Sequence, residues 1–330
     1  MHFAQRLDNV ETSAIRELFK LLGKPGIISF AGGFPDSAMF DVDGITQSSQ
    51  KALQENAGLA LQYGATEGFG PLREQLAAFM ATKGAKDVAP EQLIVTTGSQ
   101  QALDLLGKCM VSPGDKVIVE GPTFLATIQC FRLYGAEVIS APVDGNGVIV
   151  EALEKLIAEH QPKLVYLIPT FGNPSGATLS LERRKRVLEL AVKYQTLVVE
   201  DDPYGDLYFD APPPASLLAL SPEVPGSREW LAHCGSLSKV LSPGLRIGWL
   251  IANPELLAKA VMCKQFSDAH TSTFAQATAA QYLQAGHMPA TLAKVRKVYA
   301  SRAKAMMDAL RSELGDAVEF TEPQGGLFLW

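Results

Sequence analysis

The sequence has 330 residues, of which 47% are hydrophobic and 19% are charged, and its formal net charge at neutral pH is −6. A chain of this length and composition can bury a large core, and it suits one large α/β domain plus a smaller one better than a single small domain. Its basic residues are scattered rather than gathered in a stripe, so we expect no nucleic-acid partner.

The chain carries no signal for a membrane, a metal or an oxidising compartment. No apolar run approaches the length of a membrane span, and residues 1–15 lack the apolar core of a secretory signal. The five histidines show no metal-ligand spacing, and the four cysteines lie far apart in apolar segments without a CxxC pair. We therefore expect a cytoplasmic protein that binds neither a membrane nor a metal.

The first 45 residues combine a helical pattern with a glycine-containing segment. Apolar residues recur at helical spacing within residues 1–24, which predicts a short amphipathic helix. Farther along, Gly32 and Gly33 lack side chains, so the backbone there could approach a ligand closely. A plain loop is the simpler interpretation of these two glycines.

From about residue 71 the chain alternates between helical and strand patterns. Helical spacing covers residues 71–83, 99–111, 123–134, 150–160, 181–194 and 254–268. Short, nearly all-apolar runs rich in β-branched residues cover 93–96, 116–119, 137–139, 164–168 and 197–200. This alternation predicts a mostly parallel sheet with helices on both faces, because parallel strands need crossover helices and are then buried on both sides.

Two further apolar runs complete the predicted sheet. One strand ends near Gly235 and the next starts near Arg246, a gap too short for a crossover helix, so these two strands should run antiparallel. We therefore predict a three-layer α/β/α domain over residues 46–268, with seven strands of which one is antiparallel.

The two chain ends, residues 1–45 and 269–330, should form a smaller α/β domain. A long helical pattern covers residues 288–313, and the apolar residues within 320–330 predict a strand. Because this apolar run continues to the last residue, Trp330, we expect the small domain to be incomplete at its C-terminal end.

Polar residues gather where the predicted strands end. In open α/β sheets, ligands bind beyond the carboxyl ends of the strands. Five polar clusters follow the strands in this way, and packing does not explain them: they cover residues 97–101, 120–124, 170–176, 200–204 and 235–246.

The last of these clusters contains Lys239, on a short segment between two apolar strands. Burial there favours the neutral, nucleophilic amine, which is suited to forming a Schiff base with an aldehyde. Ser236, Ser238 and Arg246 could hold a dianion beside it, with two hydroxyls and one planar guanidinium. An aldehyde joined to a phosphate describes pyridoxal 5'-phosphate (PLP). An ordinary loop lysine flanked by serines is the alternative.

Other clusters could serve the same ligand. Ser99 opens a helix, where it is either a simple N-cap or part of an anion site. Asp201 and Asp202 end a buried strand, and either could pair with a protonated pyridine nitrogen; the pattern does not choose between them. Tyr204 and Asn173 could bind a phenolic oxygen, although Asn-Pro is also a common turn.

Two aromatic residues have structural alternatives as well. Phe124 could stack on a flat ring, or it could belong to the core. Tyr63 precedes the alternating region, so it could reach the ligand only from another part of the fold or from another subunit.

Taken together, these motifs resemble the class I and II aminotransferases, which are PLP enzymes of fold type I. The likeness is greatest to the branch of the 2-aminoadipate and kynurenine aminotransferases and the catalytic half of MocR-type regulators. It covers essentially the whole chain, and its motifs stand in the family's order: residues 63–73, 98–101, 172–176, 201–204 and 236–239 with Arg246.

The resemblance implies a role for each residue. Lys239 would form the Schiff base with PLP, Asp201 would pair with the pyridine nitrogen, and Tyr204 with Asn173 would bind the phenolic oxygen. Phe124 would stack on the ring. The phosphate would be surrounded by Ser99, Gln100, Ser236, Ser238 and Arg246, with Tyr63 reaching it from the partner subunit of a homodimer. Three residues would lie near the substrate: Gly33, Asn173 and Arg16.

The implied activity is transfer of an amino group between an L-amino acid and a 2-oxo acid, such as 2-oxoglutarate or pyruvate, in ping-pong order. One departure stands against it. Family members continue beyond the segment that ends here at Trp330, and that part carries an arginine for the substrate carboxylate, whereas no arginine follows Arg311. Two alternatives follow: a PLP-binding regulatory or catalytically silent protein, or another PLP reaction such as β-elimination or decarboxylation.

Overall fold

The computed structural model describes residues 1–7, 26, 29–30 and 32–330. Its centre is one sheet with the strand order β1-β8-β7-β6-β5-β2-β3-β4. The strands are β1 (Leu93–Thr97), β2 (Lys116–Gly121), β3 (Glu137–Asp144), β4 (Gly147–Val148), β5 (Leu164–Leu167), β6 (Leu197–Asp202), β7 (Leu231–Ser236) and β8 (Ile247–Ile251).

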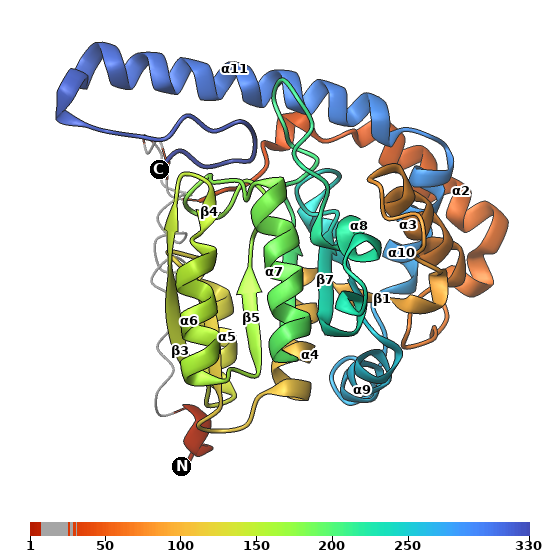
Figure 1. The fold of residues 1–330 in the computed structure, drawn as a ribbon. Coiled ribbons are helices and arrows are strands. Elements are labelled where there is room, and N and C mark those ends of the chain that lie inside the picture. Colours follow the sequence, from red (N-terminus) through yellow and green to blue (C-terminus); the bar gives the residue numbers. More distant parts are fainter. Residues whose placement is uncertain (8–25, 27–28, 31) are drawn as a thin grey trace.

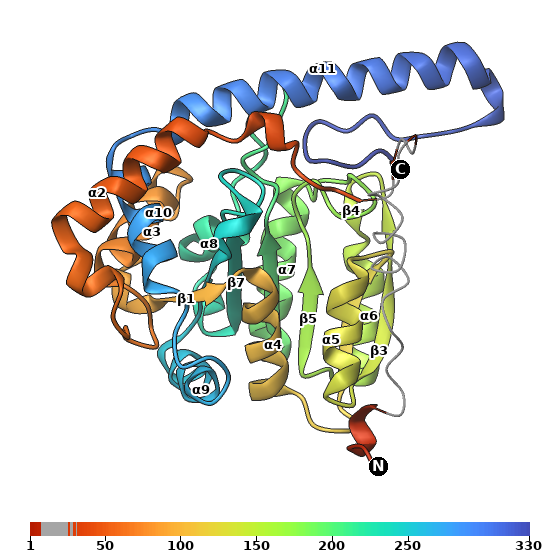
Figure 2. The ribbon, with the colours of Figure 1, turned by 180° about the vertical axis from the view of Figure 1, so that it is seen from behind.

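Helices cover both faces of this sheet, so the predicted three-layer α/β/α architecture is confirmed (Figures 1 and 2). One face is covered by α4 (Ser99–Met110), α5 (Leu125–Leu133) and α9 (Pro254–Gln265). The other is covered by α6 (Val150–His160), α7 (Leu181–Tyr194) and α8 (Leu217–Leu220). The strands between these layers are almost entirely buried, as the all-apolar runs require, except β3, which is largely exposed or half-buried.

Strand directions agree with the prediction and add one strand to it. β8 runs antiparallel to both of its neighbours, β1 and β7, while the pairs among β2, β3, β5, β6 and β7 are parallel. The sheet therefore has eight strands instead of seven. The extra strand, β4, is a two-residue return of the chain onto the end of β3, and it is too short for a strand pattern to reveal it.

Two helices were not predicted: α2 (Val42–Ala60) and α10 (Thr273–Gln284). α2 and α10 pack against each other, and α3 (Gly70–Thr82) also packs against α10. The buried residues of α2 are Gly44, Ser48, Ala52 and Ala60, and α10 is buried largely through Ala and Thr residues. Small side chains let two helices approach closely, but they leave a weak hydrophobic stripe in the sequence.

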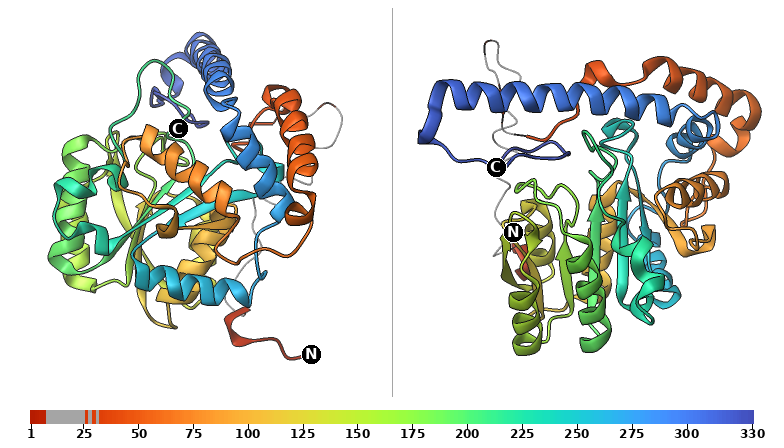
Figure 3. Two further views of the ribbon diagram at one scale, coloured as in Figure 1. Left: turned by 90° about the vertical axis from the view of Figure 1, so that its right-hand side faces the viewer. Right: turned by 45° about the horizontal axis from the view of Figure 1, so that its top comes forward.

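The long helix α11 (Met288–Leu314) confirms the pattern at residues 288–313, and it lies across the edge at which β5 ends (Figures 1 and 3). The predicted strand within 320–330 is wrong. This segment folds back under α11 as a loop, and its contact with other backbone is one isolated bridge between Gly325 and Tyr208, flanked by two hydrogen bonds. The Thr321 N–H donates a hydrogen bond to the Trp330 carbonyl at 2.9 Å, so the two ends of the segment are joined to each other.

The amphipathic helix predicted within residues 1–24 falls mostly outside the described residues. Before that gap, Gln5–Leu7 form one 3₁₀ turn. Among the helices that the structure describes, none has the length and apolar character needed to cross a bilayer.

Candidate active site

Lys239 lies just beyond β7, in the short connection to β8, and its amine donates a hydrogen bond to the carbonyl oxygen of Gly33 at 2.7 Å. Burial lowers the pKa of the Lys239 amine to about 8, and the positive charge of Arg246 adds to this effect. The neutral form of the amine is therefore accessible near neutral pH, as nucleophilic attack on a carbonyl requires.

Asp201 and Asp202 lie next to each other on β6, so their side chains point to opposite faces of the sheet. Asp202 is fully engaged: one oxygen accepts from Gly205 N–H at 2.9 Å, and the other accepts from the Lys83 amine at 3.0 Å. Burial alone would raise the pKa of Asp202, but the charge and hydrogen bond of Lys83, together with the nearby His233 and Arg184, outweigh it and lower that pKa.

Asp201 has a different environment. Its Oδ2 accepts a hydrogen bond from the hydroxyl of Tyr166 at 2.7 Å, whereas its Oδ1 is buried and has no partner among the described residues. Burial raises the pKa of Asp201 to about 7. A buried carboxylate oxygen without a donor is costly, so Oδ1 fits a ligand atom that carries a proton.

Asn173 and Tyr204 follow the neighbouring strands β5 and β6, and they meet above the sheet. The Asn173 amide donates to the Tyr204 hydroxyl at 3.4 Å. Tyr204 is buried, and burial raises the pKa of its hydroxyl. The Tyr204 ring also packs edge-on against Phe328, with 5.6 Å between the ring centroids.

A second group of side chains forms around the start of α4, and we call Ser99, Gln100, Ser236, Ser238 and Arg246 the anion cup. The pairing of β8 with both β1 and β7 places Arg246, which precedes β8, beside Ser238 and beside Thr97 at the end of β1. Ser99 and Gln100 open α4 directly after that strand.

Arg246 is held in the anion cup by three hydrogen bonds. Its guanidinium donates to the Thr97 carbonyl at 3.2 Å, to the Pro243 carbonyl at 3.3 Å and to the Ser238 hydroxyl at 3.4 Å. Gly98, which precedes α4, has a φ of +77°, and a Cβ atom there would lie 2.3 Å from Arg246 Nη2. Glycine is therefore needed at this position, both for the backbone conformation and for the close approach of the arginine.

The anion cup offers one cation, hydroxyl groups and the N-terminus of a helix. The first N–H groups of an α-helix have no partner within the helix, and the helix dipole favours negative charge there. The Ser236 hydroxyl accepts from the backbone N–H of Ser238 at 3.1 Å and donates to the Ile247 carbonyl at 3.5 Å, which is long for such a bond. A group with these donors is suited to bind a phosphate dianion.

The remaining predicted residues fall in three places. Phe124 directly precedes α5 and packs partly buried against the core. Gly33 touches Lys239, and a Cβ atom there would lie 2.5 Å from the Phe328 ring. Tyr63 is 86% exposed, and its ring contact is an edge-on packing with His270. Arg16 lies outside the described residues.

Sequence reasoning missed two residues of the site. The strand pattern predicts Tyr166 only as part of a buried strand. A phenol in an otherwise apolar run needs a partner for its hydroxyl, and this need is the signal that could have pointed to the site. Phe328 was assigned to a strand, but it packs on Tyr204 and beside Gly33. No sequence pattern links residue 328 to residues 33 and 204.

A nucleophilic lysine beside an anion cup meets the needs of an enzyme that uses PLP, as does the buried acid Asp201 on β6, whose Oδ1 has no partner among the described residues. The comparisons agree: the chain belongs to the aminotransferase class I and II family, whose sequence model matches residues 27–330.

Two curated relatives are similar over nearly the whole chain. It is 39% identical to aromatic-amino-acid aminotransferase 1 of Thermococcus litoralis, over 100% of this chain and 79% of the relative. It is 40% identical to the 2-aminoadipate transaminase of Thermus thermophilus, over 99% of this chain and 80% of the relative. These similarities identify a transaminase.

Solved structures give the same result for the fold and the cofactor. The alpha-aminoadipate aminotransferase LysN of Thermus thermophilus, complexed with N-(5'-phosphopyridoxyl)-L-leucine, matches with a TM-score of 0.91 at 39% identity. The kynurenine aminotransferase of Pyrococcus horikoshii, in complex with PMP, matches with a TM-score of 0.93 at 38% identity. Each match covers 99% of this chain and 81% of the other. The chain is thus a transaminase of fold type I that uses PLP.

Proposed function

We propose that Lys239 is the lysine that binds PLP covalently and that Asp201 pairs with the cofactor's ring nitrogen. The observation that carries this proposal is the buried Oδ1 of Asp201, which has no partner among the described residues. A protonated pyridine nitrogen donates one hydrogen bond, and it supplies the positive charge that a buried carboxylate needs. Asp202 cannot serve in this way, because Gly205 and Lys83 occupy its oxygens.

The other contacts of the cofactor follow from the same placement. Asn173 and Tyr204 hold the phenolic oxygen, and Phe124 stacks on the ring. The phosphate occupies the anion cup, where the N-terminus of α4 and Arg246 balance its charge. When bound, PLP supplies an electron sink that takes up the electron pair left by breaking the Cα–H bond of an amino acid.

The residues of the chain perform the proton transfers. Lys239 would hold the cofactor covalently, because its lowered pKa makes the neutral amine available near neutral pH. With a substrate bound, the same amine would act as the base that takes the Cα proton and as the acid that gives the proton back. Asp201 would keep the ring nitrogen protonated.

The substrates are an L-amino acid and a 2-oxo acid, with 2-oxoglutarate or pyruvate as the acceptor, used in ping-pong order. Gly33 and Asn173 would lie beside the substrate carboxylate. The names of the relatives, which act on aromatic amino acids and on 2-aminoadipate, support a large side chain on the amino donor.

The protein acts as a cytoplasmic homodimer in which Tyr63 reaches the phosphate of the partner subunit. Exposed apolar side chains near Tyr63 support this proposal. The Thr273 hydroxyl donates to the Gln62 carbonyl at 3.2 Å, and the Tyr63 ring packs on His270, so residues 59–63 lie beside residues 270–274. Leu59, Leu61, Tyr63 and Phe266 are each at least 60% exposed. Exposed apolar groups of this kind mark interfaces.

We assign residues 46–268 to the large PLP-binding domain, and residues 1–45 and 269–330 to the small domain. The layers in Figure 1 support this division, because α11 and the segment after it lie outside the sheet and its covering helices.

An assay of amino-group transfer tests the proposed function. The protein is incubated with PLP, 2-oxoglutarate or pyruvate, and a panel of amino acids, and the oxo acid formed from each amino acid is measured. We expect activity with at least one amino acid and none in Lys239→Ala. Oxo-acid formation that is unchanged in Lys239→Ala would refute the assignment of the lysine.

A further inference from the structure

Lys264, near the end of α9, is a buried lysine for which the proposed mechanism has no use. Its side chain is 0% exposed. Its ammonium donates to Gln101 Oε1 at 2.9 Å, to Asp268 Oδ1 at 2.8 Å and to Thr271 Oγ1 at 3.0 Å. All three N–H bonds of the ammonium are therefore used, as a buried cation requires.

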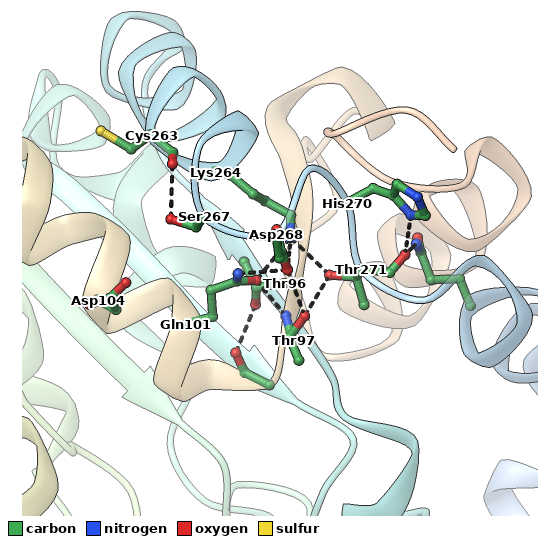
Figure 4. A network of polar contacts seen from close by, with 12 residues as sticks. Thr96, Thr97, Gln101, Asp104, Cys263, Lys264, Ser267, Asp268, His270 and Thr271 are labelled. Carbon is green, nitrogen blue, oxygen red and sulfur yellow. Dashed lines mark hydrogen bonds and ion pairs between the residues drawn. The ribbon is translucent and has the colours of Figure 1, made fainter. Parts of the chain in front are cut away.

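These side chains, which we call the Lys264 network, converge on Thr97 (Figure 4). Gln101 Oε1 accepts from the Thr97 backbone N–H at 2.7 Å, and Asp268 Oδ2 accepts from the Thr97 hydroxyl at 3.0 Å. The Thr271 hydroxyl lies 3.1 Å from the same Thr97 hydroxyl. Gln101 also donates to Asp268 at 2.7 Å, so the network is closed.

Thr97 is the residue through which the Lys264 network meets the anion cup. It is the last residue of β1, and Gly98 and Ser99 at the start of α4 follow it directly. Its carbonyl oxygen accepts from Arg246 at 3.2 Å. The N–H of Thr97 is thus held by Gln101 of α4 and its hydroxyl by residues that follow α9, while its carbonyl is held from the side of the cup.

We propose that Lys264 is a positioning residue for the cofactor's phosphate: through Gln101 and Asp268 it fixes Thr97 and, with it, the turn that aims the first N–H groups of α4. This inference rests on the proposed function of the anion cup. Lys264 touches neither cofactor nor substrate in this account. Its positive charge also offsets that of Asp268, a carboxylate that would otherwise repel a nearby dianion.

The proposal predicts a selective effect on phosphate. Lys264→Met keeps the length of the side chain but removes the ammonium, so Thr97 loses its fixed partners and Asp268 keeps an unbalanced charge. Pyridoxal, which lacks the phosphate but has the same ring and aldehyde, does not need the cup. A purely structural role for Lys264 in joining α9 to α4 would weaken the binding of both ligands alike.

Titration of the apoenzyme with PLP and with pyridoxal, followed by absorbance, tests this. In Lys264→Met we expect PLP to bind about tenfold more weakly and pyridoxal to bind within about twofold of wild type, the size of effect typical of hydrogen bonds to charged groups. Inorganic phosphate should also compete less well with PLP. Lys259→Met is the matched control, because it removes an exposed lysine from the same helix. It should change the binding of neither PLP nor pyridoxal.

Equal losses for both ligands, or no loss for PLP, would overturn the proposal. Thr271→Val provides the test if Lys264→Met does not fold, since it deletes only the hydroxyl shared by Lys264 and Thr97; the expected loss is about threefold for PLP alone. A wild-type protein that takes up neither PLP nor pyridoxal would instead refute the proposed function.

Discussion

Tyr166 and Asp201 lie on neighbouring strands, β5 and β6, and the Tyr166 hydroxyl donates to Asp201 Oδ2 at 2.7 Å, while Oδ1 has no partner in the part of the chain that the structure describes. The tyrosine thus orients the carboxylate and leaves one oxygen for a ligand. Burial raises the pKa of Asp201, and the hydrogen bond from Tyr166 opposes that rise.

Tyr166→Phe removes this hydrogen bond, so the pKa of Asp201 should rise above about 7. The ionised form that pairs with the ring nitrogen then becomes scarcer at neutral pH. We expect PLP to bind about tenfold more weakly at pH 7, with much of the loss recovered at pH 8.5. The measurement is the PLP dissociation constant of the apoenzyme as a function of pH, and a loss that is independent of pH would contradict this reading.

The two adjacent acids, Asp201 and Asp202, should behave in opposite ways when each is changed to Asn. Asp201→Asn should weaken PLP binding by roughly ten- to a hundredfold, because a charge-assisted hydrogen bond is lost. Asp202→Asn should leave PLP binding nearly unchanged but lower the free energy of unfolding by about 3 kcal/mol, because Lys83 loses part of its buried counter-charge. PLP titration and urea unfolding of both variants check this, and a reversed pattern would show that the acids are misassigned.

Asp201 should also make the apoenzyme less stable as the pH rises. The pKa of Asp201 is about 7 in the folded protein against an ordinary value of 3.8, so the folded state retains a proton that the unfolded chain has lost. The stability from this group is fully present below pH 4 and is lost as the pH rises through about 7, by up to about 4 kcal/mol.

The Asp201→Asn side chain carries no proton that titrates in this pH range, so this variant should lack the loss of stability that comes from Asp201. Urea unfolding of both apoenzymes from pH 4 to pH 8 isolates the contribution of Asp201. Glu120, whose pKa burial raises to about 8, contributes in the same direction to both proteins and cancels in the difference. Parallel curves for the two proteins would rule out a raised pKa at Asp201.

Arg246 should set the pH at which Lys239 reacts. Burial and the charge of Arg246 lower the pKa of Lys239 to about 8, so its rate of combination with pyridoxal should rise with pH through about 8. Arg246→Gln should move this midpoint upward, whereas Arg246→Lys, which keeps the charge, should not. Stopped-flow absorbance measures the rate, and pyridoxal avoids any effect of a weakened anion cup.

The sequence predicted the sheet because strand and helix patterns alternate along the chain. It predicted polar side chains at one edge because parallel strands end there: Lys239, Asn173 and Tyr204 each follow a strand, and the side chains of Asn173 and Tyr204 meet. Asp201 and Asp202 could not be separated in the same way, because the choice depends on which face of β6 meets Lys83, and that is a property of the packed structure.

The errors also have physical causes. The apolar run at 320–330 reads as a strand, yet Phe328 packs on Tyr204 instead of pairing in a sheet. Thr97 and Lys264 are 167 positions apart, and only the packing of α9 against α4 links them. Polar networks of this kind leave no periodic pattern in the chain.

The covalent bond between Lys239 and the cofactor is the central claim, and borohydride trapping tests it most directly. The protein is loaded with PLP, reduced with borohydride, digested and mapped by mass spectrometry. We predict that the phosphopyridoxyl group lies on the peptide containing Lys239 and that Lys239→Ala carries none. A group attached to another lysine, or an equal yield from Lys239→Ala, would contradict the account.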